Sequence, residues 1–266
     1  MARARSFALD LCSVINMTRD ILNLPTEATM VSVAWHAEEA AITQTEPTFG
    51  QLQLNAKRLD GYGKVTNELL QDSAIDIISL LVEQFAYAIG QELDNQVLNG
   101  TGDPASGLLT AACGNSVVMA SGLTDFSSVT GTNLSSLIYA LNSGDLANAR
   151  FIVGRLGLHY IRTLKDANNN FIFSQIGGIP PAGGTIWGFP YLVSEKVTNT
   201  TGVSTAFISF GDYKKFYLGR RVGAMALDLD PYGLFTTYAT QFRMVTRWAL
   251  GIGRSTAFSR LLTAAS

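Results

Sequence analysis

Charged residues are scarce in this sequence, at 15% of its 266 positions, compared with about a quarter in average globular proteins. With 47% hydrophobic residues, the chain is globular rather than disordered and can bury a large core or several interfaces. Because few charges remain for the outside, we expect much of the surface to be covered by other protein copies. The formal net charge of −2 also disfavours a dedicated nucleic-acid binder, which carries a clustered basic excess.

Cysteine and histidine are also rare, with two of each. Cys12 and Cys113 lie far apart without a CxxC spacing, so we expect reduced, inert thiols and neither a disulfide framework nor a zinc site. His36 stands near Glu38 and Glu39, but side chains so close along a hairpin would face poorly for binding one metal ion. We interpret these three residues as solvated loop charges.

Catalytic sequence motifs are missing as well. The chain contains no GxSxG or HExxH, and the string GIGRST at 251–256 lacks the lysine of a phosphate-binding loop. His159 falls in an expected helix, where a partly buried structural histidine is the default interpretation. We therefore expect no catalytic residues, no cofactor, no metal and no enzymatic activity.

Long hydrophobic runs are absent. No run approaches the 18 apolar residues of a membrane span, so we expect no membrane partner. The N-terminal segment 6–17 is interrupted by Asp10 and is not followed by a small-residue cleavage site, unlike a secretory signal. These features predict a protein made and assembled in a cytosol.

The most prominent feature that the chain does have is a stretch free of helix breakers. Residues 67–98 contain no proline and one glycine, Gly90, and their apolar residues recur at helical spacing. These apolar residues are Leu70, Ile77, Leu81, Phe85, Ile89 and Val97. The pattern predicts one continuous helical strut of roughly 45 Å, which stops at residues 99–100 and is followed by a turn at 102–104.

Two alternating segments before the strut predict a long hairpin. Residues 30–35 and 51–59 alternate as strands and are joined by a polar, acidic connection. Residues 1–30 are expected to form a short amphipathic piece and an extended arm, in which Pro25 stops any helix. Because a hairpin with little core of its own is marginally stable, we expect it to lie against a neighbouring subunit.

Residues from about 110 to 225 form a second composition block, rich in Gly, Ser, Thr and Asn, which predicts a separate α/β module. Its expected elements are helices at 134–146 and 156–165, and strands at 149–154, within 184–197, and on both sides of a turn within 206–221. The last part, 235–252, alternates as one or two strands.

Five segments, in their order along the chain, resemble the major capsid proteins of tailed bacteriophages. They are LNGTGDPASGLL (98–109), LKDANNNFIF (164–173), WGFPYLVSEKV (187–197), FISFGD (207–212) and TRWALGIGRSTAF (246–258). No single motif is diagnostic, but the ordered series is specific. The resemblance covers residues from about 30 to 257, nearly the whole chain.

The resemblance implies an α+β fold of the Hong Kong 97 type, also called the Johnson fold. The implied parts are an N-terminal arm (1–30), an extended hairpin loop or E-loop (31–66), a peripheral domain with a spine helix (67–123), an axial domain (124–226) and return strands of the peripheral domain (227–266). The implied function is structural: copies assemble as pentamers and hexamers into an icosahedral shell around double-stranded DNA. The short segment before the hairpin predicts that scaffolding comes from a separate protein or that the chain is a processed or incomplete form.

Some members of this family join their subunits by an isopeptide bond between a lysine and an asparagine, promoted by a glutamate. Where the resemblance would place these three groups, this chain has Gln51, Tyr238 and Val245. It therefore implies a shell without covalent cross-links. The residues expected to contact neighbouring subunits through the hairpin are Phe49, Leu52, Leu54 and Lys57.

The implied partners are other copies of the chain and packaged double-stranded DNA, held by weak non-specific contacts. Portal, scaffolding and cement or decoration proteins are further candidate partners. The expected location is the virion capsid, assembled in the cytoplasm of a bacterial host. Two alternatives stay open: an encapsulin-type nanocompartment shell that encloses a cargo enzyme, and a non-assembling α/β binding protein that behaves as a monomer.

Overall fold

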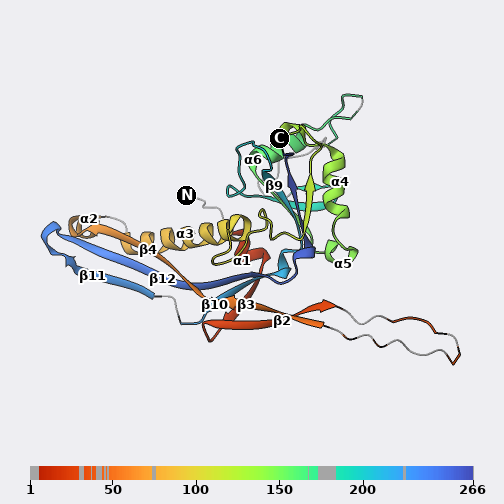
Figure 1. The fold of residues 1–266 in the computed structure, drawn as a ribbon. Helices are drawn as coiled ribbons and strands as arrows, with labels where there is room; N and C mark the ends of the chain where they lie inside the picture. Colours follow the sequence, from red (N-terminus) through yellow and green to blue (C-terminus); the bar gives the residue numbers. More distant parts are fainter. Residues whose placement is uncertain are drawn as a thin grey trace.

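The computed structural model describes residues 6–29, 33–36, 38–39, 44, 46, 48–73, 76–166, 168–172, 184–223 and 226–265. A long sheet and a long helix make up one part of the molecule, and a second sheet with short helices makes up the other (Figure 1). A two-stranded arm projects from the first part, and the C-terminus lies in the second. The expected mixture of helices and sheets is confirmed.

The first sheet has five strands and is organised around β12 (Ala239–Ile252). One side of β12 pairs antiparallel with β4 (Lys57–Thr66), and the other side pairs with β11 (Ala226–Leu234) and then β10 (Phe216–Arg221). The strand β1 (Ser13–Met17) lies parallel to β10. Alternate residues of β12 are buried on one face, as the period of two along a strand requires.

The helix α3 (Ile77–Asn99) covers this buried face (Figure 1). Its 23 residues give a length of about 35 Å. The ring of Phe85 packs so close to β4 that a Cβ added to Gly61 would lie 2.8 Å from it. Towards its C-terminal end, α3 is buried through Leu93, Val97 and Leu98, whereas its N-terminal half is largely exposed. The helix thus joins the body at one end and reaches outwards at the other.

The second sheet has six strands. In spatial order they are β5 (Asn115–Val118), β13 (Phe258–Leu262), β9 (Ala206–Gly211), β6 (Arg150–Val153), β8 (Phe189–Val193) and β7 (Thr185–Ile186). The accompanying helices are α4 (Gly131–Tyr139), α5 (Ser143–Leu146) and α6 (Arg155–Arg162). Aromatic pairs fill the interior: the rings of Phe126 and Phe207 stack at 4.2 Å, and those of Phe151 and Phe210 lie 4.3 Å apart.

A single hydrophobic core joins the two parts. It includes Phe216 and Trp248 from the first sheet, Leu98 from α3, and Phe151 and Phe258 from the second sheet. Two modules that share one core bury their facing surfaces from water, which stabilises both.

The N-terminal helix α1 (Phe7–Leu11) is attached to α3 by one buried carboxylate. Asp94 accepts hydrogen bonds from the Ser6 hydroxyl at 2.6 Å, the Ala8 amide at 3.0 Å and the Phe7 amide at 3.4 Å. The amides of a first helical turn have no partner within their own helix, so Asp94 satisfies them from outside. Burial raises the pKa of Asp94 above its ordinary value, and these donors offset only part of that rise.

The predicted continuous strut is wrong at its start, because residues 67–98 form two helices. A short helix, α2 (Asn67–Asp72), ends before Ser73, and α3 begins only at Ile77. The Asp76 side chain accepts hydrogen bonds from the Ile78 amide at 3.0 Å and the Ser79 amide at 3.4 Å, an N-cap that starts a new helix. The predicted stop at 99–100 is confirmed.

The predicted hairpin strand at 30–35 is also wrong. The described residues 33–36 are not in a strand, and residues 30–32 lie outside the described residues. The arm instead pairs β2 (Ile21–Thr29) with β3 (Thr48–Asn55). Pro25 therefore sits inside a strand, which is possible because a two-stranded ribbon leaves the outward side of each strand unpaired. The predicted strand at 51–59 is divided at Ala56, and its second part belongs to β4.

The second module differs from the prediction in four details. The predicted helix at 134–146 is divided into α4 and α5, and the helix predicted at 156–165 ends at Arg162. β10 belongs to the five-stranded sheet although it lies within 124–226, and β13 belongs to the six-stranded sheet although it lies within 227–266. The strand predicted at 149–154 is confirmed as β6, and the one predicted within 235–252 as β12.

We expect Asp94→Ala to lower the free energy of unfolding by about 2–4 kcal/mol, because it leaves the Ser6 hydroxyl and two amides without partners. Urea unfolding of the unassembled subunit measures this change. Glu83→Ala, at an exposed position of the same helix, is the control and should change stability by less than about 0.5 kcal/mol. Equal stability of the two variants would show that Asp94 does not hold α1.

The raised pKa of Asp94 also predicts a pH dependence. Between the ordinary value of 3.8 and the raised pKa, the folded chain holds a proton at Asp94 that the unfolded chain has lost. The stability from this proton is therefore present at low pH and lost as pH rises through the raised pKa. Unfolding measured across acid pH should show that wild type loses stability relative to Asp94→Asn over this window. Parallel curves for the two proteins would contradict the prediction.

Candidate assembly surfaces

The base of the arm has a small hydrophobic core of its own. Leu54 and Ala56 are buried there with Met17 of β1 and Ala249 of β12, and Leu52 packs against them. A Cβ added to Gly251 would lie 2.7 Å from the Leu54 side chain, so a glycine at this position of β12 leaves room for that side chain. The base of the arm is therefore fastened to its own subunit.

The outer part of the arm has no comparable support. Phe49 is 69% exposed, and every described residue among 33–36, 38–39, 44 and 46 is exposed. The arm leads away from the body (Figure 1). A two-stranded ribbon without a packed face is marginally stable in water, so this segment needs a surface outside its own subunit.

The four predicted contact residues therefore fall into different environments. Phe49 is exposed and available to a neighbour, whereas Leu54 is fully buried in its own subunit, so its predicted role as an intersubunit contact is wrong. Leu52 is half-buried against the same small core. Lys57 begins β4, and its ammonium group lies 3.3 Å from the carboxylate of Asp103.

The three positions considered for cross-linking lie on three different strands or turns. Gln51 is exposed on the arm opposite Pro25. Tyr238 adopts a left-handed backbone conformation just before β12, and its hydroxyl accepts a hydrogen bond from Gln71 at 3.3 Å. Val245 lies in β12, between the two strands that flank it. Isopeptide chemistry requires an amine, an amide that it attacks and a carboxylate. These three side chains together do not provide that set.

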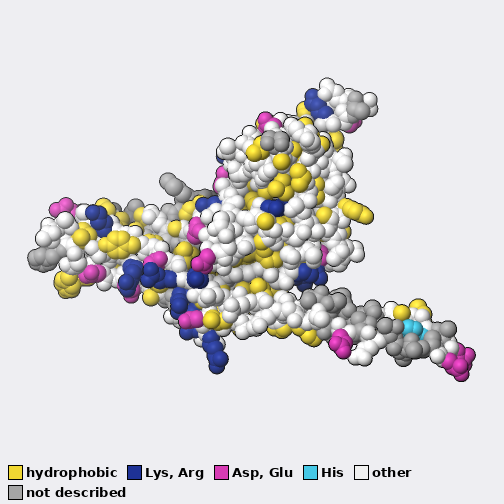
Figure 2. Space-filling view, viewed as in Figure 1, with side chains coloured by type: hydrophobic (Ala, Val, Ile, Leu, Met, Phe, Trp, Pro, Cys, Tyr) yellow, Lys and Arg dark blue, Asp and Glu magenta, His cyan; other side chains and the backbone are white. Residues whose placement is uncertain are grey.

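Oppositely charged side chains pair on and beside the five-stranded sheet. Asp20 lies 3.5 Å from Arg221 and 3.0 Å from Arg247, and Arg58 lies 3.3 Å from Asp60. Arg58 and Arg247 are direct cross-strand partners, where like charges alone would repel. Figure 2 shows several Lys and Arg side chains below the centre of the molecule and acidic side chains at the far end of the arm.

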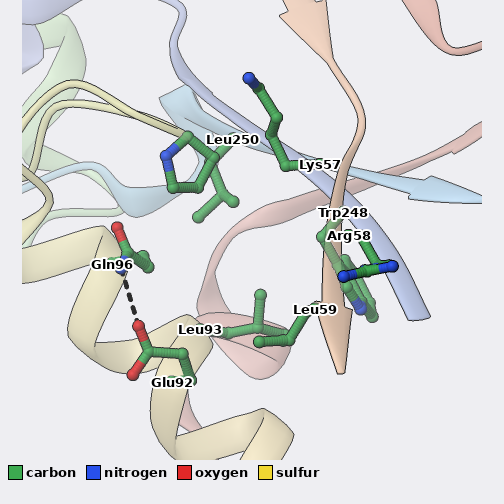
Figure 3. Close-up of a pocket in the computed structure, with 9 residues that line it drawn as sticks. Lys57, Arg58, Leu59, Glu92, Leu93, Gln96, Trp248 and Leu250 are labelled. Atoms are coloured by element: carbon green, nitrogen blue, oxygen red, sulfur yellow. Dashed lines mark hydrogen bonds between the residues drawn. The ribbon is translucent and has the colours of Figure 1, made fainter. Parts of the chain in front are cut away.

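A pocket of about 190 Å³ lies between the start of β4 and the C-terminal half of α3. Its apolar walls come from Leu59, Leu93, Pro104, Trp248 and Leu250. Lys57, Arg58, Glu92 and Gln96 complete the lining (Figure 3). The pocket thus combines an apolar interior with a lining that carries charged residues of both signs.

The residues considered for catalysis or metal binding do not come together. Within the described ranges, no group of three His, Cys, Asp or Glu side chains is placed to hold a metal ion. His36, Glu38 and Glu39 are exposed, as predicted for solvated loop charges. His159 is exposed rather than partly buried, which corrects that prediction.

The cysteines are both buried and unpaired, as predicted. Burial raises the pKa of Cys113 to about 11 and that of Cys12 further, so both remain protonated and unreactive near neutral pH. No helix in the described part of the chain is long and apolar enough to cross a membrane.

Sequence reasoning missed half of the arm and its exposed tip. The half-buried Leu22 and Leu24 alternate along β2, and this signal was available in the sequence. Pro25 directly follows Leu24 and disfavours a strand there, because proline removes a backbone hydrogen-bond donor. Val33 and Trp35 are 94% and 103% exposed. The sequence did not indicate this, because an alternating apolar pattern is typical of a half-buried strand.

A model of the phage capsid family matches residues 1–261. Among solved structures, the capsid of a native GTA particle is similar with a TM-score of 0.85 and 23% identity, covering 100% of this chain and 92% of that chain. A structure from Mycobacterium phage Adephagia gives a TM-score of 0.76 at 19% identity, with 100% and 92% coverage. One from Gordonia phage Cozz gives 0.75 at 15% identity, with 100% and 89% coverage. No curated protein matches this chain in sequence.

We expect Leu54→Ala to lower the free energy of unfolding by about 2–5 kcal/mol, because the deleted side chain leaves a cavity at the base of the arm. The same variant should be cleaved faster in the arm during limited proteolysis. Phe49→Ala is the control: its exposed side chain lies on the same strand, and its removal should leave unfolding within about 0.5 kcal/mol of wild type. If both variants unfold like wild type, the arm is not held at Leu54.

Proposed function

The chain belongs to the phage capsid family, and we propose that it is the major capsid protein of a tailed phage or a phage-like particle. The protein is structural and not an enzyme. The family match over residues 1–261 favours this proposal over the alternative of a non-assembling α/β binding protein. The corresponding location is the virion capsid, and assembly in the cytoplasm of a bacterial host is part of the proposal.

We assign the fold to the Hong Kong 97 type. The five-stranded sheet with α3 corresponds to a peripheral domain with its spine helix, and the six-stranded sheet with α4, α5 and α6 corresponds to an axial domain. The arm of β2 and β3 corresponds to the extended loop. With these elements, the arm spans 21–55, the axial domain includes β13, and the peripheral domain includes β1 and β10.

The unsupported outer part of the arm is the observation that favours assembly of several copies. Its base is packed inside the subunit while its outer part is exposed, which suits a segment that lies over a neighbouring copy. Copies arranged in closed rings give every arm the same receiving surface. We therefore propose that the chain forms pentamers and hexamers, and that these tile an icosahedral shell.

The charge of the chain suits a shell around double-stranded DNA. A net charge of −2 and paired basic residues leave little excess for binding phosphate, so contacts with packaged DNA would be weak and non-specific. Tight binding would hinder both packaging and release. Portal, scaffolding and cement proteins remain proposed partners of the same particle.

The shell is proposed to hold without isopeptide bonds. Gln51, Tyr238 and Val245 offer neither the amine nor the carboxylate that such a bond needs. Many copies of a modest contact provide the stability instead, because multivalent contacts add within a closed assembly.

Electron microscopy of particles, combined with a denaturing gel, tests this proposal. We expect closed icosahedral shells that dissolve to a single band near 28.6 kDa and contain double-stranded DNA. A ladder of higher bands that resists reduction would contradict the absence of covalent cross-links. An enclosed enzyme in place of DNA would indicate an encapsulin-type shell, and a stable monomer under all assembly conditions would overturn the shell function.

A further inference from the structure

The walls of the pocket between β4 and α3 come from both the first sheet and the long helix. Leu59 lies on β4, Trp248 and Leu250 lie on β12, and Leu93 lies on α3. The volume of about 190 Å³ exceeds the roughly 150 Å³ of an engineered apolar cavity that holds benzene. One aromatic ring therefore fits between these walls, where it can pack against apolar and aromatic side chains.

A carboxylate in the same lining has no cationic partner. Glu92 is half-buried on α3, and its carboxylate accepts hydrogen bonds from the side-chain amides of Gln96 at 2.7 Å and Asn95 at 3.4 Å. No Lys, Arg or His in the described part of the chain forms an ion pair with Glu92. The two amides hold the carboxylate in place but leave its negative charge unbalanced.

The basic residues of the lining are engaged elsewhere. The ammonium group of Lys57 lies 3.3 Å from the carboxylate of Asp103 and points away from Glu92 (Figure 3). Arg58 pairs with Asp60 at 3.3 Å, and as the next residue along β4 it points to the opposite face of the strand from Lys57. With both basic groups paired, Glu92 gives the pocket a net negative charge.

We propose that this pocket binds a small primary amine with an aromatic body. The ammonium group pairs with the Glu92 carboxylate, and the ring lies between the apolar walls. A charge-assisted hydrogen bond to a half-buried carboxylate is stronger than a neutral one, and the indole of Trp248 adds an aromatic wall that favours a nearby cation. The volume suits one ring with a short amine, so the occupant is a free small molecule rather than a segment of another protein.

All residues of this site belong to one copy of the chain. The inference therefore goes beyond the proposed shell function and does not rest on it. A bound amine would contact α3, β4 and β12 at once, at the point where β4 leaves the base of the arm. Because such a ligand binds only the folded chain, it should raise the melting temperature as its concentration increases.

Titration with benzylamine, which is protonated at neutral pH, tests the proposal. Isothermal titration calorimetry of the unassembled full-length chain should show binding, and the melting temperature should rise with benzylamine concentration. Benzyl alcohol has the same ring without the charge, and its Kd should be at least about tenfold higher because the charge-assisted bond is lost. Absence of benzylamine binding, or equal affinity for the two compounds, would overturn the proposal.

Variants of α3 locate the binding site. Glu92→Gln keeps the length of the side chain but removes its charge, so the Kd for benzylamine should rise at least about tenfold while the unliganded variant melts like wild type. Glu83→Gln removes an exposed carboxylate of the same helix outside the pocket and should bind as wild type does. Equal weakening in both variants would indicate general charge attraction and contradict a site at Glu92.

A filled pocket provides a second test that leaves the charge unchanged. Leu59→Phe places a ring in the space assigned to the ligand and should abolish benzylamine binding, whereas undiminished binding would contradict the assigned pocket.

A different probe distinguishes a small molecule from a protein side chain as the occupant. N-acetyl-lysine amide carries an ammonium group on a flexible chain without a ring, and it should bind more weakly than benzylamine. Tighter binding of N-acetyl-lysine amide would indicate a lysine of another protein and would overturn the small-molecule assignment. Shell formation seen by electron microscopy is a separate measurement, so failure of the amine site leaves the proposed function standing, and the reverse also holds.

Discussion

The pairing of β12 with β4 is the interaction on which the rest of the structure depends. Ten consecutive residue pairs join these strands, and β10 and β11 attach to the other side of β12. β4 leads directly from the arm at one end and into α2 at the other, so this ladder sets where both begin. β12 continues through a short turn into β13, which enters the second sheet. One strand thus positions the arm, the long helix and the second module.

The two ends of the arm differ in their support. The base is packed within the subunit, whereas the outer part depends on a partner. Burial of Leu54 and Ala56 over Gly251 fixes the direction in which the arm leaves the body. Beyond Thr48 the described residues find no packed surface within the subunit. The apolar contact at the base involves only a few residues of the arm. The outer residues of the arm are therefore not needed for folding and can be suited to a neighbouring copy. In a shell, the same division lets the subunit fold before it assembles.

How much could be predicted from sequence depended on whether the signal was local. The buried strands β6 and β9 and the end of α3 at Asn99 follow from apolar runs and from the Asn-Gly stop. The division of the strut at Asp76 was missed because an N-cap inside an apolar pattern is weaker evidence than a proline. The partner of β3, the sheet to which β13 belongs and the pocket at Lys57 depend on tertiary pairing between distant segments. Periodicity alone does not contain that information.

The few charged residues of the five-stranded sheet are partly paired within the subunit, and this pairing has a consequence for assembly. Several basic groups of the five-stranded sheet already have an acidic partner, as Arg221 and Arg247 share Asp20 and Arg243 pairs with Asp228 at 2.7 Å. Neighbouring strands can then carry arginines without repelling one another. Because such exposed pairs contribute little each, apolar contacts would provide most of the binding in the proposed assembly, and charges would mainly influence orientation. Weak, oriented contacts repeated many times allow misplaced subunits to leave while a closed shell persists.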